Sequence, residues 1–392
     1  MDRRAISQSR LLFLDGLRGF AALFVVFHHA YFNFFFGPVG GDRFPNLLPH
    51  GVKAVADILT FGHQAVVVFI VLSGYCLMRP VVRNLGVLHG GLSGFARRRA
   101  RRILPPYYAA LVVTLLMLAL VPIPEASRYG PPPPVFTRGV LLSHLLLVQS
   151  LSPDWFGKID APTWTVATEW LIYWVFATLL LPVWRKLGIL ATVALAVILG
   201  ILPRIFHIPI ASAAPWFLGC FAFGMFGSCV ESYSAHSGKS ALSFTTWRWI
   251  SAALWSALIG IVVLRPGLMH SIAGDFFVGI ATMSLIISCA LACEAGKQTA
   301  TKKLLESRTG ATLGAFSFSL YLLHWPVLTL CDVALRALHV RPMPFFLSMM
   351  TFGVALAVAV AYLFYLVFER PFTRQFARRP APLVQELAAP AR

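Results

Sequence analysis

FLDGLRGFAALFVVFHHAYFNFFF, residues 13–36, decides the class of fold to which this chain belongs. The stretch is long enough to cross a bilayer, because about 20 predominantly apolar residues suffice. It nevertheless carries four ionisable side chains, on Asp15, Arg18, His28 and His29. A charged side chain at the bilayer centre costs about 2.5–3.5 kcal/mol on insertion scales, so such groups face the interior of a helix bundle. The stretch is therefore predicted to be one helix of a larger bundle with a polar interior.

The composition of the whole chain supports this prediction. Of its 392 residues, 58% are hydrophobic and 12% are charged, against about 25% charged in soluble proteins. The deficit runs along the full length, which favours an all-α, polytopic membrane protein over a soluble domain with one anchor. The net charge of +18 would suggest nucleic acid in a soluble protein. Here the basic residues lie between apolar stretches, where they orient helices, so no nucleic-acid partner is expected.

Hydropathy predicts ten transmembrane helices. They are expected at residues 13–36, 60–79, 103–122, 163–184, 188–203, 210–230, 249–265, 273–293, 312–336 and 345–368. A further segment near 138–150 is too short to cross and is expected to be re-entrant or interfacial. The orientation then follows from the rule that basic connections lie on the cytoplasmic side. If the segment 138–150 does not cross, one side of the membrane holds all the strongly basic parts, namely the connections 79–102, 185–186 and 294–311 and the tail. Both termini are therefore predicted to be cytoplasmic.

The chain is predicted to form one membrane domain, residues 1–372, followed by a flexible cytoplasmic tail, residues 373–392. Residues 124–136, PEASRYGPPPPVF, are expected to form a polyproline-like outer loop. The six cysteines lie in or beside apolar segments without CxxC spacing. They are interpreted as small apolar residues, and neither a disulfide nor a metal site is expected.

Helical geometry relates three of the buried charges. Arg18 and His29 are 11 residues apart, which places them on one face within about 20° and about 16.5 Å apart along the axis. His29 lies seven residues before the outer end of its span, and Glu169 lies seven residues inside its own span from Pro162. At one depth, the imidazole and the carboxylate could form a general-base pair. The alternatives are that Arg18 snorkels to the surface and that His29 and Glu169 bond neighbouring helices.

Two further motifs carry polar groups into the bundle. Ser317, Tyr321 and His324 share one helix face, which indicates either the lining of a cavity or an interhelical hydrogen-bond seam. Ser73 precedes Gly74, a pair typical of helix packing, and the sequence offers Ser73 no adjacent base.

An arginine cluster opens the third span. Arg99 and Arg102 share one helix face, and Arg98 belongs to a second pair with Arg101. Paired guanidinium groups suit phosphate oxygens, although acidic lipid headgroups and the orientation of the helix also call for positive charge here.

These motifs, in this order, resemble the acyltransferase-3 family of integral-membrane acyltransferases, which O-acylate bacterial surface glycans and some natural products. The matching pieces span residues 14–372 and are LDGLRGFAAL…HH, VLSGY, RRARRILPPY, TWTVATEW, FSFSLYLLHWPV and ERPF. The chain departs from many members at Val67, where they carry Asp, and at Trp170 and Leu171, where they show Glu and Gln.

The resemblance implies an O-acetyltransferase of the bacterial inner membrane. The family's first-helix motif coincides with Arg18 and His29, its paired-arginine motif with Arg99 and Arg102, and its Trp-to-Glu element with Trp164 and Glu169. It implies acetyl-CoA as the cytoplasmic donor and a sugar hydroxyl, on a glycan or lipid-linked glycan, as the outer acceptor.

The residues then take the following expected roles. Catalysis is assigned to His29, Glu169 and Arg18, binding of the acyl-CoA donor to Arg98, Arg99, Arg102 and Arg18, and lining of the substrate path to Ser73, Trp164, Ser317, Tyr321 and His324. Membrane lipids are expected partners, and transient acylation of a histidine is an alternative to direct transfer. The rival function is a transporter or flippase of a glycan or lipid-linked substrate, which also needs a polar path through the membrane.

Overall fold

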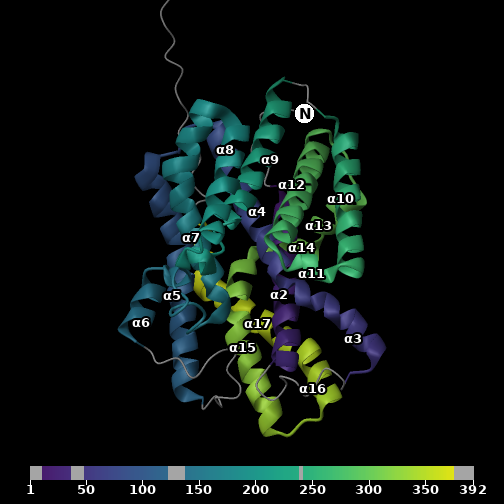
Figure 1. Cartoon of the computed structure of the whole chain (residues 1–392). Helices are drawn as coiled ribbons and strands as arrows, with labels where there is room; N and C mark the ends of the chain where they lie inside the picture. Colours follow the sequence, from purple (N-terminus) through teal and green to yellow (C-terminus); the bar gives the residue numbers. More distant parts are fainter. Residues whose placement is uncertain (1–10, 37–47, 122–136, 238–241, 375–392) are drawn as a thin grey trace, which may run out of the picture.

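The computed structural model describes residues 11–36, 48–121, 137–237 and 242–374, and those residues form helices and no strand (Figure 1). The long helices are α2 (Leu12–Phe36), α4 (Gly62–Arg83), α5 (Gly91–Leu120), α7 (Trp164–Val175), α8 (Leu181–Ile205), α9 (Phe217–Ser237), α10 (Phe244–Leu264), α12 (Ile272–Glu294), α15 (Ser317–Ala337) and α17 (Val354–Phe364). The short ones are α3 (His50–Ala56), α6 (Arg138–Leu145), α11 (Pro266–Met269), α13 (Ala300–Leu305), α14 (Arg308–Ala315), α16 (Pro342–Ser348) and α18 (Arg370–Arg374). The outer loop 124–136 and the tail from residue 375 onward lie outside the described residues.

The all-α, polytopic membrane architecture is confirmed. Eight stretches of the described residues are long and apolar enough to cross a membrane. One of them, Ala161–Ile205, has 45 residues, about twice the length that one crossing needs. Its helix breaks at Gly188, which has φ 80° and ψ 179°, a conformation that only glycine adopts without strain. The break falls where the sequence separates its fourth and fifth predicted spans, and the total of ten crossings remains a prediction.

Three predicted boundaries differ from the observed helices. The sixth span was expected from residue 210, but Pro209–Ala213 forms a 3₁₀ turn and α9 begins at Phe217. The ninth was expected to be one helix, but α14 ends before Phe316, and α15 starts at Ser317. The third was expected to start at residue 103, but α5 already begins at Gly91 and includes the arginine cluster. Hydropathy locates apolar residues, whereas the ends of a helix are set by its backbone hydrogen bonds. The two kinds of boundary therefore need not coincide.

The segment 138–150 forms a short helix, as its length requires. α6 has eight residues and is followed by the 3₁₀ turn Gln149–Leu151. At 1.5 Å per residue, α6 is about 12 Å long, too short to cross a bilayer. This agrees with the prediction that the segment does not span the membrane.

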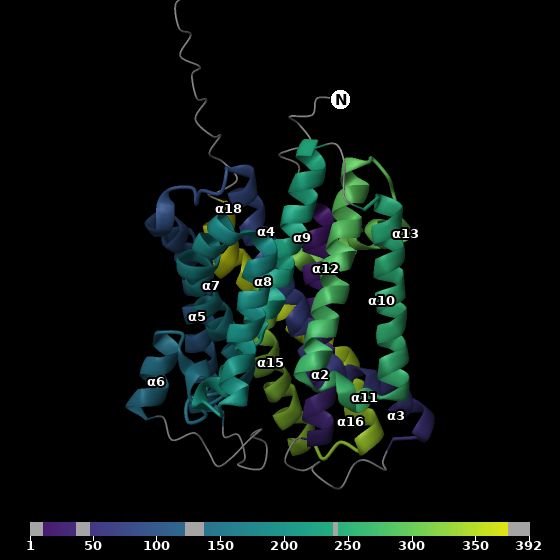
Figure 2. The ribbon, with the colours of Figure 1, turned by 45° about the horizontal axis from the view of Figure 1, so that its top comes forward.

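The bundle has two chemically different ends. Figure 2 shows α13 and α18 near one end and α3, α6, α11 and α16 near the other. The first is called the arginine end, because the basic connections 79–102 and 294–311 lie there, and the second is called the far end. α2 runs between them and packs against α4, α14 and α15, so its polar residues face protein rather than lipid.

Small residues allow a close contact between α4 and α9. A Cβ atom on Gly74 would lie 2.0 Å from the carbonyl oxygen of Phe221, and one on Gly224 would lie 2.0 Å from that of Val71. Such close packing is how membrane helices associate without a hydrophobic driving force. Gly74 thus has the packing role that its sequence context indicates, and it fixes the position of α4, which carries Ser73.

Candidate active site

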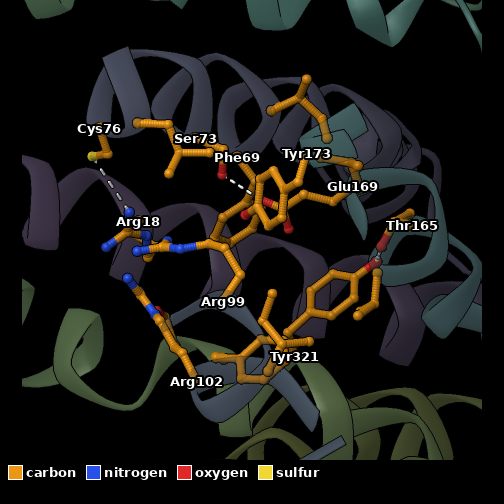
Figure 3. Close-up of a pocket in the computed structure, with 17 residues that line it drawn as sticks. Arg18, Phe69, Ser73, Cys76, Arg99, Arg102, Thr165, Glu169, Tyr173 and Tyr321 are labelled. Atoms are coloured by element: carbon orange, nitrogen blue, oxygen red, sulfur yellow. Dashed lines mark hydrogen bonds between the residues drawn. The ribbon is translucent and has the colours of Figure 1, made fainter. Parts of the chain in front are cut away.

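A cavity of about 100 Å³ lies within the bundle and is lined by five helices, α2, α4, α5, α7 and α15 (Figure 3). Its lining comprises Arg18, Val66, Phe69, Ile70, Ser73, Cys76, Leu77, Arg99, Arg102, Ile103, Thr165, Val166, Glu169, Tyr173, Ser317, Phe318 and Tyr321. Besides Glu169, this lining contains six residues that the sequence assigned to catalysis, donor binding or the substrate path. They are Arg18, Ser73, Arg99, Arg102, Ser317 and Tyr321.

Three guanidinium groups gather on one side of this cavity. Figure 3 shows the nitrogen atoms of Arg18, Arg99 and Arg102 together, across from Glu169 and Tyr173. Arg102 is exposed, whereas the Nε atom of Arg99 is buried and has no hydrogen-bond partner among the described residues. A buried donor without a partner is costly, and an anion entering the cavity would satisfy it. Arg98, which the sequence analysis also assigned to donor binding, does not line the cavity.

Arg18 is the arginine that comes from α2. Its Nη2 donates to the Sγ atom of Cys76 over 3.7 Å, and its Nη1 lies 3.8 Å from the carboxylate of Asp15. These long contacts orient the group without neutralising the cluster, because three arginines share the cavity with one lining carboxylate, that of Glu169. The cavity therefore has an excess of positive charge.

Glu169 joins α7 to α4 across the cavity. Its Oε1 atom accepts hydrogen bonds from the hydroxyl groups of Ser73 and Tyr173. The structure thus supplies the carboxylate beside Ser73 that the sequence did not reveal. Tyr173 was also missed, although its position four residues after Glu169 on the same helix is the spacing at which side chains meet.

His29 pairs with another histidine. Its Nδ1 atom lies 3.1 Å from Nε2 of His324 and 3.1 Å from the carbonyl oxygen of Val25. The Nδ1 atom of His324 lies 3.2 Å from the carbonyl oxygen of Leu320. A carbonyl oxygen can only accept, so Nδ1 carries the hydrogen in each ring. In the neutral rings, Nε2 of His324 then accepts from His29, and Nε2 of His29 keeps its lone pair as a potential base.

His29 and Glu169 have different partners, and no hydrogen bond joins the two among the described residues. His324 connects the histidine pair to the cavity, because its ring lies 5.6 Å from that of Tyr321, which is part of the cavity lining. The imidazole pair is therefore adjacent to the cavity lining through His324.

The remaining predicted positions divide between the cavity and the far end. Tyr321 donates to the carbonyl oxygen of Pro162 over 3.0 Å, and its hydroxyl lies 2.6 Å from that of Thr165, a lining residue that the sequence analysis missed. Ser317 lines the cavity and donates to a carbonyl group of its own chain segment. Trp164 does not line the cavity and packs at the start of α7, toward the far end.

The described residues contain no group of three or more side chains that could hold a metal ion. The charges that line the cavity suit a different ligand, since forked guanidinium donors match phosphate oxygens. The site thus offers anion-binding groups, a carboxylate held by two hydroxyl groups, and an imidazole with an available lone pair nearby.

Comparison with known proteins identifies the family. A family model described as an acyltransferase domain, of the acyltransferase-3 family, matches residues 11–366, nearly the whole chain. Comparisons with curated proteins and with solved structures find no significant match. The matched range contains the five helices that form the cavity. The chain therefore belongs to the acyltransferase-3 family of integral-membrane acyltransferases.

Proposed function

We propose that this protein is an O-acetyltransferase of the bacterial inner membrane. It would move an acetyl group from cytoplasmic acetyl-CoA to a hydroxyl group of an extracytoplasmic glycan or glycolipid. The arginine end would face the cytoplasm with both termini, as the distribution of basic connections favours. Membership of the family supports acyl transfer, and the charges of the cavity support this choice of donor.

The donor would enter at the arginine end. Coenzyme A carries phosphate groups, which the exposed Arg102 and the half-buried Arg99 suit as forked donors. The pantetheine arm with its thioester would enter the cavity, and the nucleotide would stay at the mouth beside Arg102. The unpartnered Nε atom of Arg99 is the single observation that carries this proposal, because a buried guanidinium nitrogen without a partner calls for an anion.

Transfer would join the two halves of the site. The oxygen of the acceptor hydroxyl attacks the thioester carbonyl carbon, the carbon–sulfur bond breaks, and an ester and the thiol of coenzyme A are formed. Nε2 of His29 takes the hydroxyl proton as general base, and this proton balances the thiolate that leaves. Arg18, about 16.5 Å from His29 along the axis of α2, holds a phosphate group or guides the donor at the arginine end. Glu169 holds Ser73 and Tyr173 in place along the path of the thioester.

The test is a comparison of surface glycans from cells with and without this protein. We expect the glycan mass to rise by one acetyl unit when the protein is present, and membranes containing the protein to incorporate label from acetyl-labelled CoA into glycan. A shift by a larger acyl unit would revise the donor. Unchanged glycans, with labelled acetyl-CoA left intact by the membranes, would contradict the proposed function. Movement of an unmodified glycan across the membrane without loss of acetyl-CoA would favour transport instead.

A further inference from the structure

A histidine and a buried aspartate meet at the far end, outside the site described above. Nε2 of His63, on α4, lies 2.9 Å from Oδ2 of Asp275, on α12. The indole nitrogen of Trp216 donates to the same oxygen over 2.8 Å. Asp275 is 3% exposed, and its Oδ1 atom is buried without a hydrogen-bond partner among the described residues. Helices far apart in sequence thus build a polar pair that the proposed transfer step does not use.

The pair leaves one ring nitrogen of His63 available. A carboxylate and an imidazole share one hydrogen here, so Nε2 of the neutral ring donates it to Asp275, and Nδ1 keeps a lone pair. No hydrogen bond to this Nδ1 is found in the described part of the chain, and the side chain of His63 is 36% exposed. An imidazole oriented by a buried carboxylate is a strong hydrogen-bond acceptor. Nδ1 is therefore suited to accept a hydrogen from a hydroxyl group that arrives from outside.

The position of His63 continues the wall of the cavity. Ser73, Phe69 and Val66 line the cavity along one face of α4, and His63 lies three residues beyond Val66, about 4.5 Å further along the axis. On α7, Trp164 directly precedes the lining residue Thr165. The pair therefore lies one helical turn from the cavity, on its far-end side.

Aromatic rings surround this pair. The rings of His63 and Trp164 are nearly parallel, with centroids 6.4 Å apart and an interplanar angle of 14°. Phe156 and Phe217 pack against Trp164 with centroids 5.4 and 6.0 Å away. Ligand sites combine such aromatic surface with a few oriented polar groups. A sugar ring offers the complement, since its C–H bonds form apolar patches and its hydroxyl groups donate hydrogen bonds.

We propose that His63, Asp275 and Trp164 form the binding site for the acceptor, a carbohydrate ring with one hydroxyl donating to Nδ1 of His63. The identity of this ligand as acceptor rests on the proposed function, but the carbohydrate site itself does not. Asp275 is a positioning residue, because it acts on the ligand only by orienting the His63 ring. The sugar enters from the far end and meets the thioester arriving through the cavity from the arginine end.

The first test measures binding without any transfer. Full-length protein in proteoliposomes is treated with diethyl pyrocarbonate, which modifies neutral imidazoles, and modification of each histidine is followed by peptide mass. The probe is the surface glycan of cells that lack the protein, freed of O-acyl groups by mild base. Near saturation, glycan should slow modification of His63 about tenfold, because the reagent reaches only the unoccupied fraction. His270, an exposed far-end histidine stacked on Phe61, should react at an unchanged rate.

The outcomes separate this inference from the proposed function. Protection of His63 supports the carbohydrate site even if the same proteoliposomes fail to acetylate the glycan, a result that would count against the proposed function alone. Unchanged modification of His63 overturns the inference, whether or not acetyl transfer occurs. Equal protection of His63 and His270 also overturns it, since general shielding of the far end would explain that result.

The second test uses a conservative variant. His63→Gln keeps an amide N–H that can donate to Asp275 but lacks the imidazole acceptor, so the fold should persist. We expect the KM for the glycan probe to rise about tenfold, the value of one hydrogen bond of about 1.4 kcal/mol, with an unchanged KM for acetyl-CoA. Asp275→Asn should shift the glycan KM in the same direction, whereas His270→Gln should match the unsubstituted protein. A His63→Gln variant with an unchanged glycan KM would contradict the proposal, as would an equal change in the KM for acetyl-CoA.

Discussion

Nδ1 of His29 and Nε2 of His324 lie 3.1 Å apart, although 295 residues separate them in sequence. α2 and α15 are thereby joined by two imidazole rings inside the bundle. The carbonyl contacts of both rings select one pair of tautomers and leave the lone pair on Nε2 of His29. His324 is thus a positioning residue for His29 rather than a second base.

This relationship predicts unequal effects at the two histidines. His29→Gln should lower acetyl transfer by at least about a hundredfold, the usual contribution of a general base. His324→Phe should lower it about tenfold and alter the pH–rate profile, because the tautomer of His29 is no longer fixed. The rate is measured across pH in membranes matched for protein content. The control is His28→Gln, because His28 contacts the carbonyl oxygen of Leu59 and not His324. A His29→Gln variant with full activity would disprove the assignment.

The arginines of the cavity allow a matched comparison on one helix. Arg102→Gln should raise the KM for acetyl-CoA about tenfold, because one charge-assisted hydrogen bond contributes about 1.5 kcal/mol or more. Arg98→Gln should change it little, since Arg98 does not line the cavity. Initial rates at varied acetyl-CoA and low ionic strength distinguish the two. Equal effects of both substitutions would indicate general attraction of anions to this end rather than a defined donor site.

Glu169 should be needed for more than packing. Glu169→Gln keeps an oxygen that accepts hydrogen bonds from Ser73 and Tyr173 but removes the negative charge beside the arginines. We expect transfer to fall about a hundredfold, as when a preorganised electrostatic group is removed from an active site. Thermal unfolding of the detergent-solubilised variant checks that the bundle persists. Ser73→Ala should lose less, and a fully active Glu169→Gln would leave the carboxylate with a structural role alone.

A buried ion cluster should contribute mainly to stability. Glu231 is 2% exposed and accepts hydrogen bonds from Arg79 at 3.1 Å and from Tyr75 at 2.7 Å. Glu231→Gln should lower the free energy of unfolding by about 2 kcal/mol, less than for a fully buried pair because the arginine is partly exposed. Tyr75→Phe should cost about 1 kcal/mol, the value of one hydrogen bond. Denaturation in detergent measures both, and an unchanged midpoint for Glu231→Gln would show that the cluster is dispensable.

Asp160 predicts a dependence of stability on pH. It is 2% exposed, both of its carboxylate oxygens lack partners among the described residues, and burial raises its pKa well above the usual value. The folded protein then binds this proton more tightly than the unfolded chain does. The resulting stabilisation is complete below the unfolded pKa and is lost as the pH rises through the folded pKa.

Asp160→Asn should remove this loss, because the amide stays neutral. The Tm of the variant should exceed that of the unsubstituted protein at about pH 8, and the difference should shrink as the pH falls. Thermal unfolding in detergent over this range measures it. Identical pH slopes for the two proteins would show that the pKa of Asp160 is the same in the folded and the unfolded state, which would contradict this prediction.

The sequence was sufficient for several residues of the site. Arg18 was predicted from helical spacing and chemistry, Arg99 and Arg102 from the family resemblance as well, and all three line the cavity. Ser317 and Tyr321 were predicted as a polar stripe and also line it. An interior position could be predicted because ionisable and hydroxyl groups are costly in lipid, whereas the roles assigned to these residues stay predictions.

Partners across helices could not be predicted in the same way. Depth along the membrane placed His29 and Glu169 at one level, but depth says nothing about the angle around the bundle. In the structure, Ser73 donates a hydrogen bond to Glu169, and His324 pairs with His29. Nothing in the sequence paired His63 with Asp275, since both lie near helix starts and their positions differ by 212.

By itself, then, the sequence determined the class of architecture and the chemical types gathered inside it, because the cost of burying charge in lipid acts on each helix separately. Only the tertiary structure decided which groups meet. Hydrogen bonds reach about 3 Å, and whether two side chains come that close depends on the packing of whole helices, down to the close approach that Gly74 and Gly224 permit between α4 and α9.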